Sequence, residues 1–175
     1  MGFLNLSARN AISDANLGMR LETGNLAAST YITGANSVRL FDVDGRVLVS
    51  QLYGEVTTAF TSDGDPLVKY VYASTDPVVA EADLSDDSGS VASLAVGTRI
   101  SLVGGDITTG AAVTASAAIS YGTVSPMIVG IRSGEGWMGI ESTIAASTAG
   151  VINWVLHYVP MEVGAICRVN VAIIT

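Results

Sequence analysis

The stretch "GVINWVLHYVPMEVGAICRVNVAIIT", residues 150–175, is the most apolar part of the chain and carries its clearest structural pattern. The first half alternates with a period of two, which is typical of a β-strand with one fully apolar face. That face holds Ile152, Trp154, Leu156 and Tyr158. Pro160 ends the pattern, the segment 160–164 can turn the chain, and the alternation resumes at 165–175. The stretch therefore predicts two paired strands joined by a short turn.

The same stretch does not have the composition of a membrane span. A spanning helix requires about 20 consecutive apolar residues. Polar, charged or helix-breaking residues interrupt the run at Asn153, His157, Pro160, Glu162 and Arg168. We therefore expect no membrane partner.

Alternation of this kind recurs upstream. The segments 37–43 and 46–56 flank Asp44-Gly45, a dipeptide that favours a hairpin turn. Further strands are predicted at 67–74, 98–104, 111–122 and 127–133. The segment 87–97 has room for one helical turn, and 8–22 is compatible with a short helix when docked. Many short strands separated by Gly-rich turns indicate an all-β fold, an antiparallel β-sandwich or a barrel of jelly-roll type. We expect this β domain to span 36–175, preceded by an extended N-terminal arm over 1–35.

Composition limits the classes of partner. The chain has 175 residues, enough for one domain with a real core, and only 14% of them are charged. Eight basic residues face sixteen acidic ones, which gives a formal net charge of −8, and Lys69 is the only lysine. Affinity for nucleic acid rests on clustered Lys and Arg. Because the basic residues here are scattered, nucleic acid is not an expected partner.

Residues that carry chemistry are scarce. His157 is the only histidine and Cys167 the only cysteine. One chain therefore lacks the residues for a two-histidine metal site or an internal disulfide, and a Ser-His-Asp triad would have to include His157. Acidic runs at 42–45, 63–65 and 83–87 lack the ligand order of a calcium loop and are interpreted as solvated turns. The "GEGWMG" segment, 134–139, lacks the lysine of a phosphate-binding loop and is predicted to be a turn. We expect no enzyme activity, no metal and no cofactor.

Three passages together resemble structural proteins of tailed-bacteriophage virions. They are "VRLFDVDGRVLVSQLYGEV" at 38–56, "LAVGTRISLVGGD" at 94–106 and "GVINWVLHYVPMEVGAICRV" at 150–169. The chain is similar to capsid decoration (cement) proteins and head-fibre-like proteins in being β-rich, acidic and poor in Lys and Cys. The resemblance implies a homotrimer that binds the major capsid protein on the outer surface of the virion and stabilises the shell. It also implies synthesis in the host cytoplasm, and the N-terminus shows no secretory signal pattern.

Contact residues are expected in two places. An arm that orders on a capsid partner by strand addition would use Phe3, Leu4 and Leu6 as anchors. The C-terminal strand pair has a second face with Val155, His157 and Val159, which is more apolar than a lone monomer needs. We expect a partner subunit to cover that face, with Trp154 and Tyr158 filling the core or the subunit junction.

Other functions stay open. A receptor- or glycan-binding β domain of a head fibre or tail would present exposed loop aromatics, with Trp137 and Tyr121 as candidates. A tail tube or adaptor subunit would form a ring of different stoichiometry. A hydrolase is the remaining alternative, and the residue inventory gives it little support.

Overall fold

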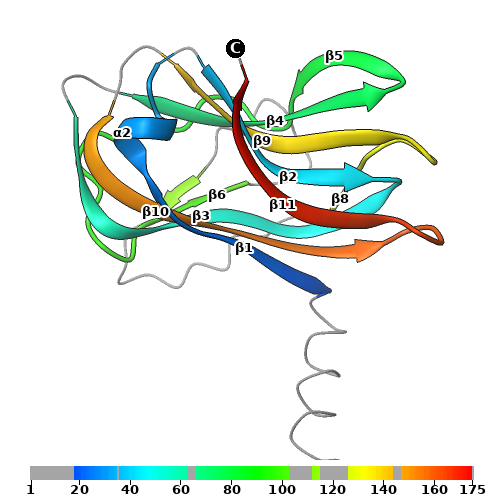
Figure 1. Ribbon diagram of the computed structural model, residues 1–175. Helices are drawn as coiled ribbons and strands as arrows, with labels where there is room; N and C mark the ends of the chain where they lie inside the picture. The colour runs from blue at the N-terminus through cyan, green and yellow to red at the C-terminus, as the bar shows by residue number, and fades with distance from the viewer. Residues whose placement is uncertain are drawn as a thin grey trace, which may run out of the picture.

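Two antiparallel sheets pack face to face as a β-sandwich that is not closed into a barrel (Figure 1). The computed structural model describes residues 18–34, 36–62, 66–102, 112–114, 126–143 and 147–174. The all-β prediction is confirmed, in its sandwich form.

The first sheet has the strand order β1, β10, β3, β6, β7, with β8 also paired to β3. Its strands are β1 (Met19–Ala27), β3 (Val47–Ser62), β6 (Arg99–Ser101), β7 (Ala112–Thr114), β8 (Met127–Val129) and β10 (Ser147–Pro160). The second sheet has the order β11, β2, β9, β4, β5. Its strands are β2 (Asn36–Asp44), β4 (Leu67–Asp76), β5 (Val78–Asp83), β9 (Glu135–Thr143) and β11 (Ile166–Ile174). One helical turn, α2 (Ala28–Tyr31), connects β1 to β2.

Both hairpins expected from the sequence are wrong. The Asp44-Gly45 turn leads from β2 in the second sheet to β3 in the first, and residues 161–165 lead from β10 to β11 in the same way. The strands on either side of each turn each carry an apolar face, and these faces are buried opposite one another across the core. The hydroxyl of Tyr158 on β10, for example, donates to the carbonyl of Cys167 on β11 at 3.5 Å. Short turns therefore join the two layers at one end of the sandwich.

The core is built around Trp154. Its indole lies edge-on to the ring of Tyr70 from the opposite sheet, with ring centroids 5.9 Å apart. Tyr70 is fully buried, and its hydroxyl donates to the carbonyl of Ile100 at 2.5 Å. Beside Trp154 in the register stands Gly54, whose missing side chain leaves room for the indole.

Several local predictions need correction. The 134–139 segment is not a turn, because Glu135–Thr143 forms the central strand β9. The helix predicted for 8–22 is wrong over 19–22, which lies in β1, and 87–97 forms turns without a helix. Residues 19–31, assigned to the arm, form β1 and α2, and β1 pairs with β10 as part of the first sheet. Turn residues with positive φ stand just before these two strands, Gly18 at +85° before β1 and Ser133 at +53° before β9, and the polar and small residues of the strands hid the boundaries.

Candidate interaction surfaces

The residues expected to meet a partner fall into three different settings. Trp154 and Tyr158 point into the core of a single chain and are at most 1% exposed, so neither presents its side chain to a neighbour. His157 lies on the other face of β10. Phe3, Leu4 and Leu6 lie outside the described residues. The three groups are therefore not brought together into one described surface.

The outer face of β10 is covered by its own sheet. His157 is 8% exposed and its ring stacks on that of Tyr53 from β3, with centroids 6.5 Å apart. The guanidinium of Arg99 lies 4.9 Å above the Tyr53 ring and donates to Glu55 from both Nε and Nη2, at 3.1 and 2.9 Å. Val155 is also buried. The expectation of a surplus apolar face at Val155 and His157 is wrong, because side chains of neighbouring strands close over it.

Positive charge on the described surface is matched by negative charge. Six of the basic side chains each lie within ion-pair distance of a carboxylate: Arg20 with Glu22, Arg39 with Asp42, Arg46 with Glu162, Lys69 with Asp83 and Glu141, Arg99 with Glu55, and Arg168 with Asp44. Burial works against the charge on Lys69, but its hydrogen bonds to Glu141 and Asp83 outweigh burial and raise the pKa of its ammonium group. The surface thus offers few uncommitted cations to an anionic partner.

The acidic runs are partly structural. Asp42 and Asp44 lie in β2, not in a loop, and Asp42 also accepts from Asn170 at 2.8 Å. Asp86 accepts from the backbone N–H of Asp87, and the 63–65 run lies outside the described residues. Within the described ranges, no group of His, Cys, Asp and Glu side chains is arranged to hold a metal ion.

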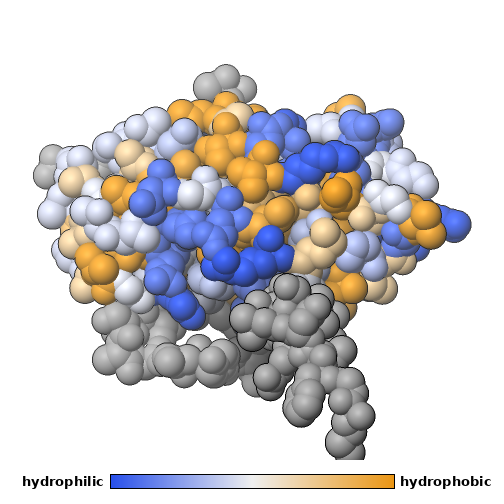
Figure 2. Space-filling model, turned by 60° about the horizontal axis from the view of Figure 1, so that its bottom comes forward, coloured by the Kyte–Doolittle hydropathy of each residue, from blue (hydrophilic) through white to orange (hydrophobic). Residues whose placement is uncertain are grey.

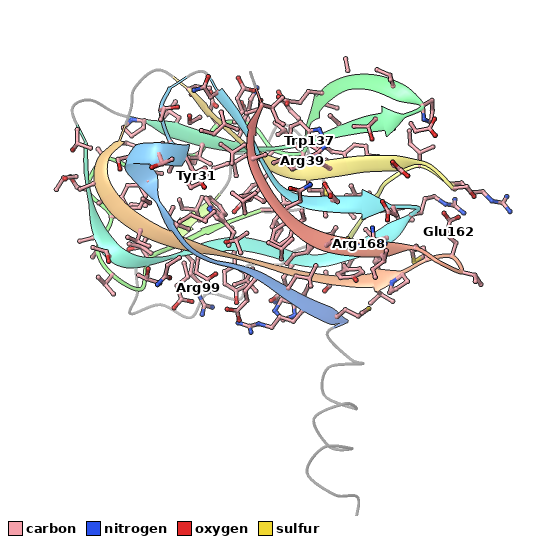
Figure 3. All side chains as sticks on the ribbon, in the orientation of Figure 1. Tyr31, Arg39, Arg99, Trp137, Glu162 and Arg168 are labelled. Atoms are coloured by element: carbon pink, nitrogen blue, oxygen red, sulfur yellow. The ribbon has the colours of Figure 1, made fainter. Side chains whose placement is uncertain are left out.

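A carboxylate ties three turns together at one end of the sandwich (Figure 3). Glu162, between β10 and β11, accepts from the backbone N–H of Ser133 at 2.9 Å and of Arg46 at 3.1 Å. The Ser133 hydrogen bond lowers the pKa of Glu162, burial offsets part of this, and the hydrogen bond and charge of Arg46 lower the pKa further. Gly45 has a φ of +72°, and a Cβ there would lie 2.7 Å from the Glu162 carboxylate.

We call this region, the turns at 44–46, 130–134 and 161–165, the tied end. Additional backbone hydrogen bonds join it: Met161 N–H to the Arg46 carbonyl at 2.9 Å, and Gly45 N–H to the Gly134 carbonyl at 2.8 Å. Large apolar side chains stand exposed on or beside it, namely Ile128, Met161 and Val163. Sequence analysis did not identify Glu162 or this apolar tip, and a glycine-bordered "PMEVG" turn was the only signal available.

Trp137 is not available for a ligand. It lies in β9, is 4% exposed, and forms a small buried cluster with Val71 and Ala73 (Figure 3). Ser37 on β2 donates to Glu81 on β5 at 2.9 Å although β9 and β4 separate these strands in the sheet, so β5 curls over the outer face. The other proposed aromatic, Tyr121, lies outside the described residues. The expected exposed tryptophan is therefore wrong.

No family model, curated protein or solved structure matches the chain. In the part of the chain that the structure describes, no helix has the length and apolarity needed to cross a bilayer.

Proposed function

We propose that this chain is a non-enzymatic virion structural protein, a capsid decoration protein that binds the outer surface of a phage shell as a trimer. Its partners are other copies of itself and the major capsid protein. Its role is mechanical, since bound trimers hold neighbouring capsomers together.

The observation that carries the proposal is the tied end. Three turns are held by one carboxylate and by backbone hydrogen bonds, so the exposed Met161 and Val163 sit on a rigid support. Exposed apolar groups on a rigid support lose little conformational freedom on binding, which favours association with another protein. Burying one such side chain contributes about 1.5–3 kcal/mol, repeated in every copy.

Charge supports the same assignment. Net charge is −8, and the described cations are largely paired with carboxylates. A protein on the outer surface of a shell has no need to neutralise phosphates, whereas one that lines packaged DNA does.

Shell binding tests the proposal directly. Purified chain is mixed with DNA-free shells of the virus that encodes it, and bound protein is measured by co-sedimentation. Wild type is expected to saturate in multiples of three, and Val163→Asp to lose binding. Val96→Asp is the matched control, because Val96 is also an exposed valine but lies in the loop whose backbone hydrogen-bonds to Val56, not to the turns of the tied end. Equal binding of both variants, or no binding of wild type, would remove the proposal.

A receptor- or glycan-binding domain is the second candidate, and one feature favours it. Tyr53 lies half-buried on the outer face of the first sheet with Arg99 and Glu55 beside it, an aromatic and polar combination that sugars can use. Glycan-array binding that Tyr53→Ala abolishes would move the assignment to this class. A tail tube or adaptor subunit would instead give a hexameric mass by light scattering.

A further inference from the structure

The outer face of the second sheet carries an apolar cluster that is separate from the main core. Trp137 on β9 pairs with Ala73 on β4, and Val71 lies two residues before Ala73 on the same face. Met138 and Tyr72, the neighbours of these residues along the two strands, face the core instead. The outer face of an antiparallel sheet is commonly solvated, yet Trp137, Ala73 and Val71 are only 4%, 8% and 0% exposed.

Other apolar residues of the molecule do reach the surface. Figure 2, in which the lower side is turned forward, shows apolar residues at the surface between strongly hydrophilic ones. Val169 and Ile173 on β11, an edge strand of the second sheet, are 42% and 41% exposed. A place in this sheet alone therefore does not hide an apolar side chain, and the Trp137 cluster needs a cover.

The strand β5 reaches across this outer face. In a flat sheet β5 would lie three strand spacings from β2, or about 14 Å. The hydroxyl of Ser37 on β2 nevertheless donates to the Glu81 carboxylate on β5 at 2.9 Å. The strand therefore curls back over β4 and β9, which carry the Trp137 cluster, and Figure 1 shows it arched beside β4.

Both ends of β5 are anchored. The strand that precedes it, β4, lies inside the second sheet between β5 and β9. The segment that follows it, 84–88, is hydrogen-bonded to β4: the Ser88 N–H donates to the Val68 carbonyl at 2.8 Å. The Tyr70 N–H donates to the hydroxyl of the fully buried Ser85 at 3.0 Å. Movement of β5 is therefore confined to the residues between these two anchors.

Between the anchors β5 is held loosely. All six of its residues are exposed, and none belongs to the main core. Its pairing with β4 is interrupted by a shift of register between Tyr72 and Ser74. Segments with few buried apolar contacts and exposed hydrogen bonds are the ones that open locally while the rest of a protein stays folded.

The side-chain contacts of β5 can separate without leaving a buried charge unpaired. Lys69 lies 3.0 Å from Asp83 on β5 and 2.8 Å from Glu141 on β9. If Asp83 moves away, Lys69 keeps Glu141, and the half-exposed Asp83 enters water. The hydrogen bond between Ser37 and Glu81 is exposed, so water replaces it. Apolar burial is therefore the main contribution that favours the closed position.

We propose that β5, residues 78–83, is a strap that closes over Trp137, Val71 and Ala73 and opens between its two anchors while the sandwich stays folded. Opening uncovers an apolar strip on the outer face of the second sheet. The strap does not involve the tied end and requires no shell. It is therefore tested on the free protein and stands or fails separately from the proposed function.

Hydroxyl-radical labelling followed by mass spectrometry tests the strap, because it measures the two tryptophans of the chain separately. Glu81→Ala with Asp83→Ala removes the two side-chain contacts of the strap. Glu22→Ala with Glu55→Ala is the matched control, since it removes two carboxylates that pair with arginines on the first sheet. Trp154 lies in the core at 1% exposure and reports unfolding of the whole chain in every sample.

The strap variant is expected to label Trp137 about tenfold faster than wild type, because a side chain that is 4% exposed gains most of its accessible surface once it is uncovered. Labelling of Trp154 is expected to stay unchanged. Unchanged labelling of Trp137 would overturn the proposal. A parallel rise at Trp154, or an equal rise at Trp137 in the control variant, would overturn it as well.

Hydrogen exchange on the unmodified chain provides a measurement that no substitution can disturb. The strap amides that pair with β4 are expected to exchange about a hundredfold faster than the amides of 84–88 that donate to β4. Equal rates would mean that the strap opens only together with its anchor, which contradicts the proposal.

Discussion

Gly54→Ala is the substitution that tests the central packing most directly. Gly54 on β3 stands opposite Trp154 on β10, and both face the core. A Cβ at this position would lie 2.6 and 2.7 Å from two carbons of the indole and 2.8 Å from a methyl group of Ile152. These distances are well inside van der Waals contact, so the indole has to move. Its edge-on contact with Tyr70 from the opposite sheet would be disturbed at the same time.

The expected loss follows from two opposing effects. Adding a methyl group to a packed core costs about 1–3 kcal/mol. Replacing glycine by alanine returns about 0.4–1 kcal/mol through the lower entropy of the unfolded chain. The net loss of unfolding free energy is therefore about 1.3 kcal/mol from the middle of these two ranges, and at most about 2.6 kcal/mol. For a chain of this size each kcal/mol corresponds to a fall of about 2–4 °C in Tm.

Urea denaturation followed by tryptophan fluorescence measures the effect. Gly89→Ala is the matched control, because Gly89 is exposed and has no atom within 4 Å of the added Cβ. Combining Gly54→Ala with Trp154→Phe is expected to recover part of the loss, with a coupling energy of about 1 kcal/mol. If Gly54→Ala were as stable as Gly89→Ala, the indole would not lie over Gly54 and the packing described above would be incorrect.

Three further predictions concern buried or tied polar groups. Tyr70→Phe leaves the buried carbonyl of Ile100 without its donor, and urea denaturation is expected to show a loss of about 1–3 kcal/mol. The pKa of Glu162 is lowered in the fold, so ionised Glu162 adds stability above the pKa of an unfolded carboxyl group and loses it as pH falls through the folded pKa. The Tm advantage of wild type over Glu162→Gln should therefore be present at pH 7 and vanish in acid; an advantage that persists at pH 2 would contradict this. Burial, with the nearby Asp44 charge, raises the pKa of Cys167 to about 12. At pH 8 a thiol reagent should accordingly react with folded protein roughly a thousandfold more slowly than with protein in urea.

The fold class could be predicted because strand periodicity is a local property. The faces of β10 were assigned correctly from alternation alone: Ile152, Trp154, Leu156 and Tyr158 are all buried. Partner strands could not be assigned in the same way. Asp44-Gly45 is a strong hairpin signal, but the flanking strands join opposite sheets, since the pairing of β2 with β11 and β9 involves residues far away in the chain.

The candidate surfaces were harder to predict, for a related reason. His157 looked exposed because its own strand offers only Val155 and Val159 as neighbours, whereas Tyr53 and Arg99 on adjacent strands complete its surroundings. Glu162 has no sequence pattern that marks it, because its partners are backbone N–H groups of two distant turns. The three glycines around Trp137 predict a turn from sequence alone. In β9 those glycines instead allow close approach of neighbouring backbone, as at Gly139, where a Cβ would lie 1.9 Å from the Val38 carbonyl oxygen.

The most apolar stretch comes late in the chain, yet its first half completes the interior of the first sheet. β10 is an interior strand of the first sheet, between β1 and β3, and its Trp154 fills the space over Gly54. Until residues 147–160 are made, β1 has no described partner strand and β3 lacks the neighbour that covers most of its length. The turn at 161–165 then carries the chain across to β11, which places Glu162 against the two earlier turns. Completion of the core and formation of the tied end therefore depend on the same late segment, so a chain shortened before 147 should lose both together.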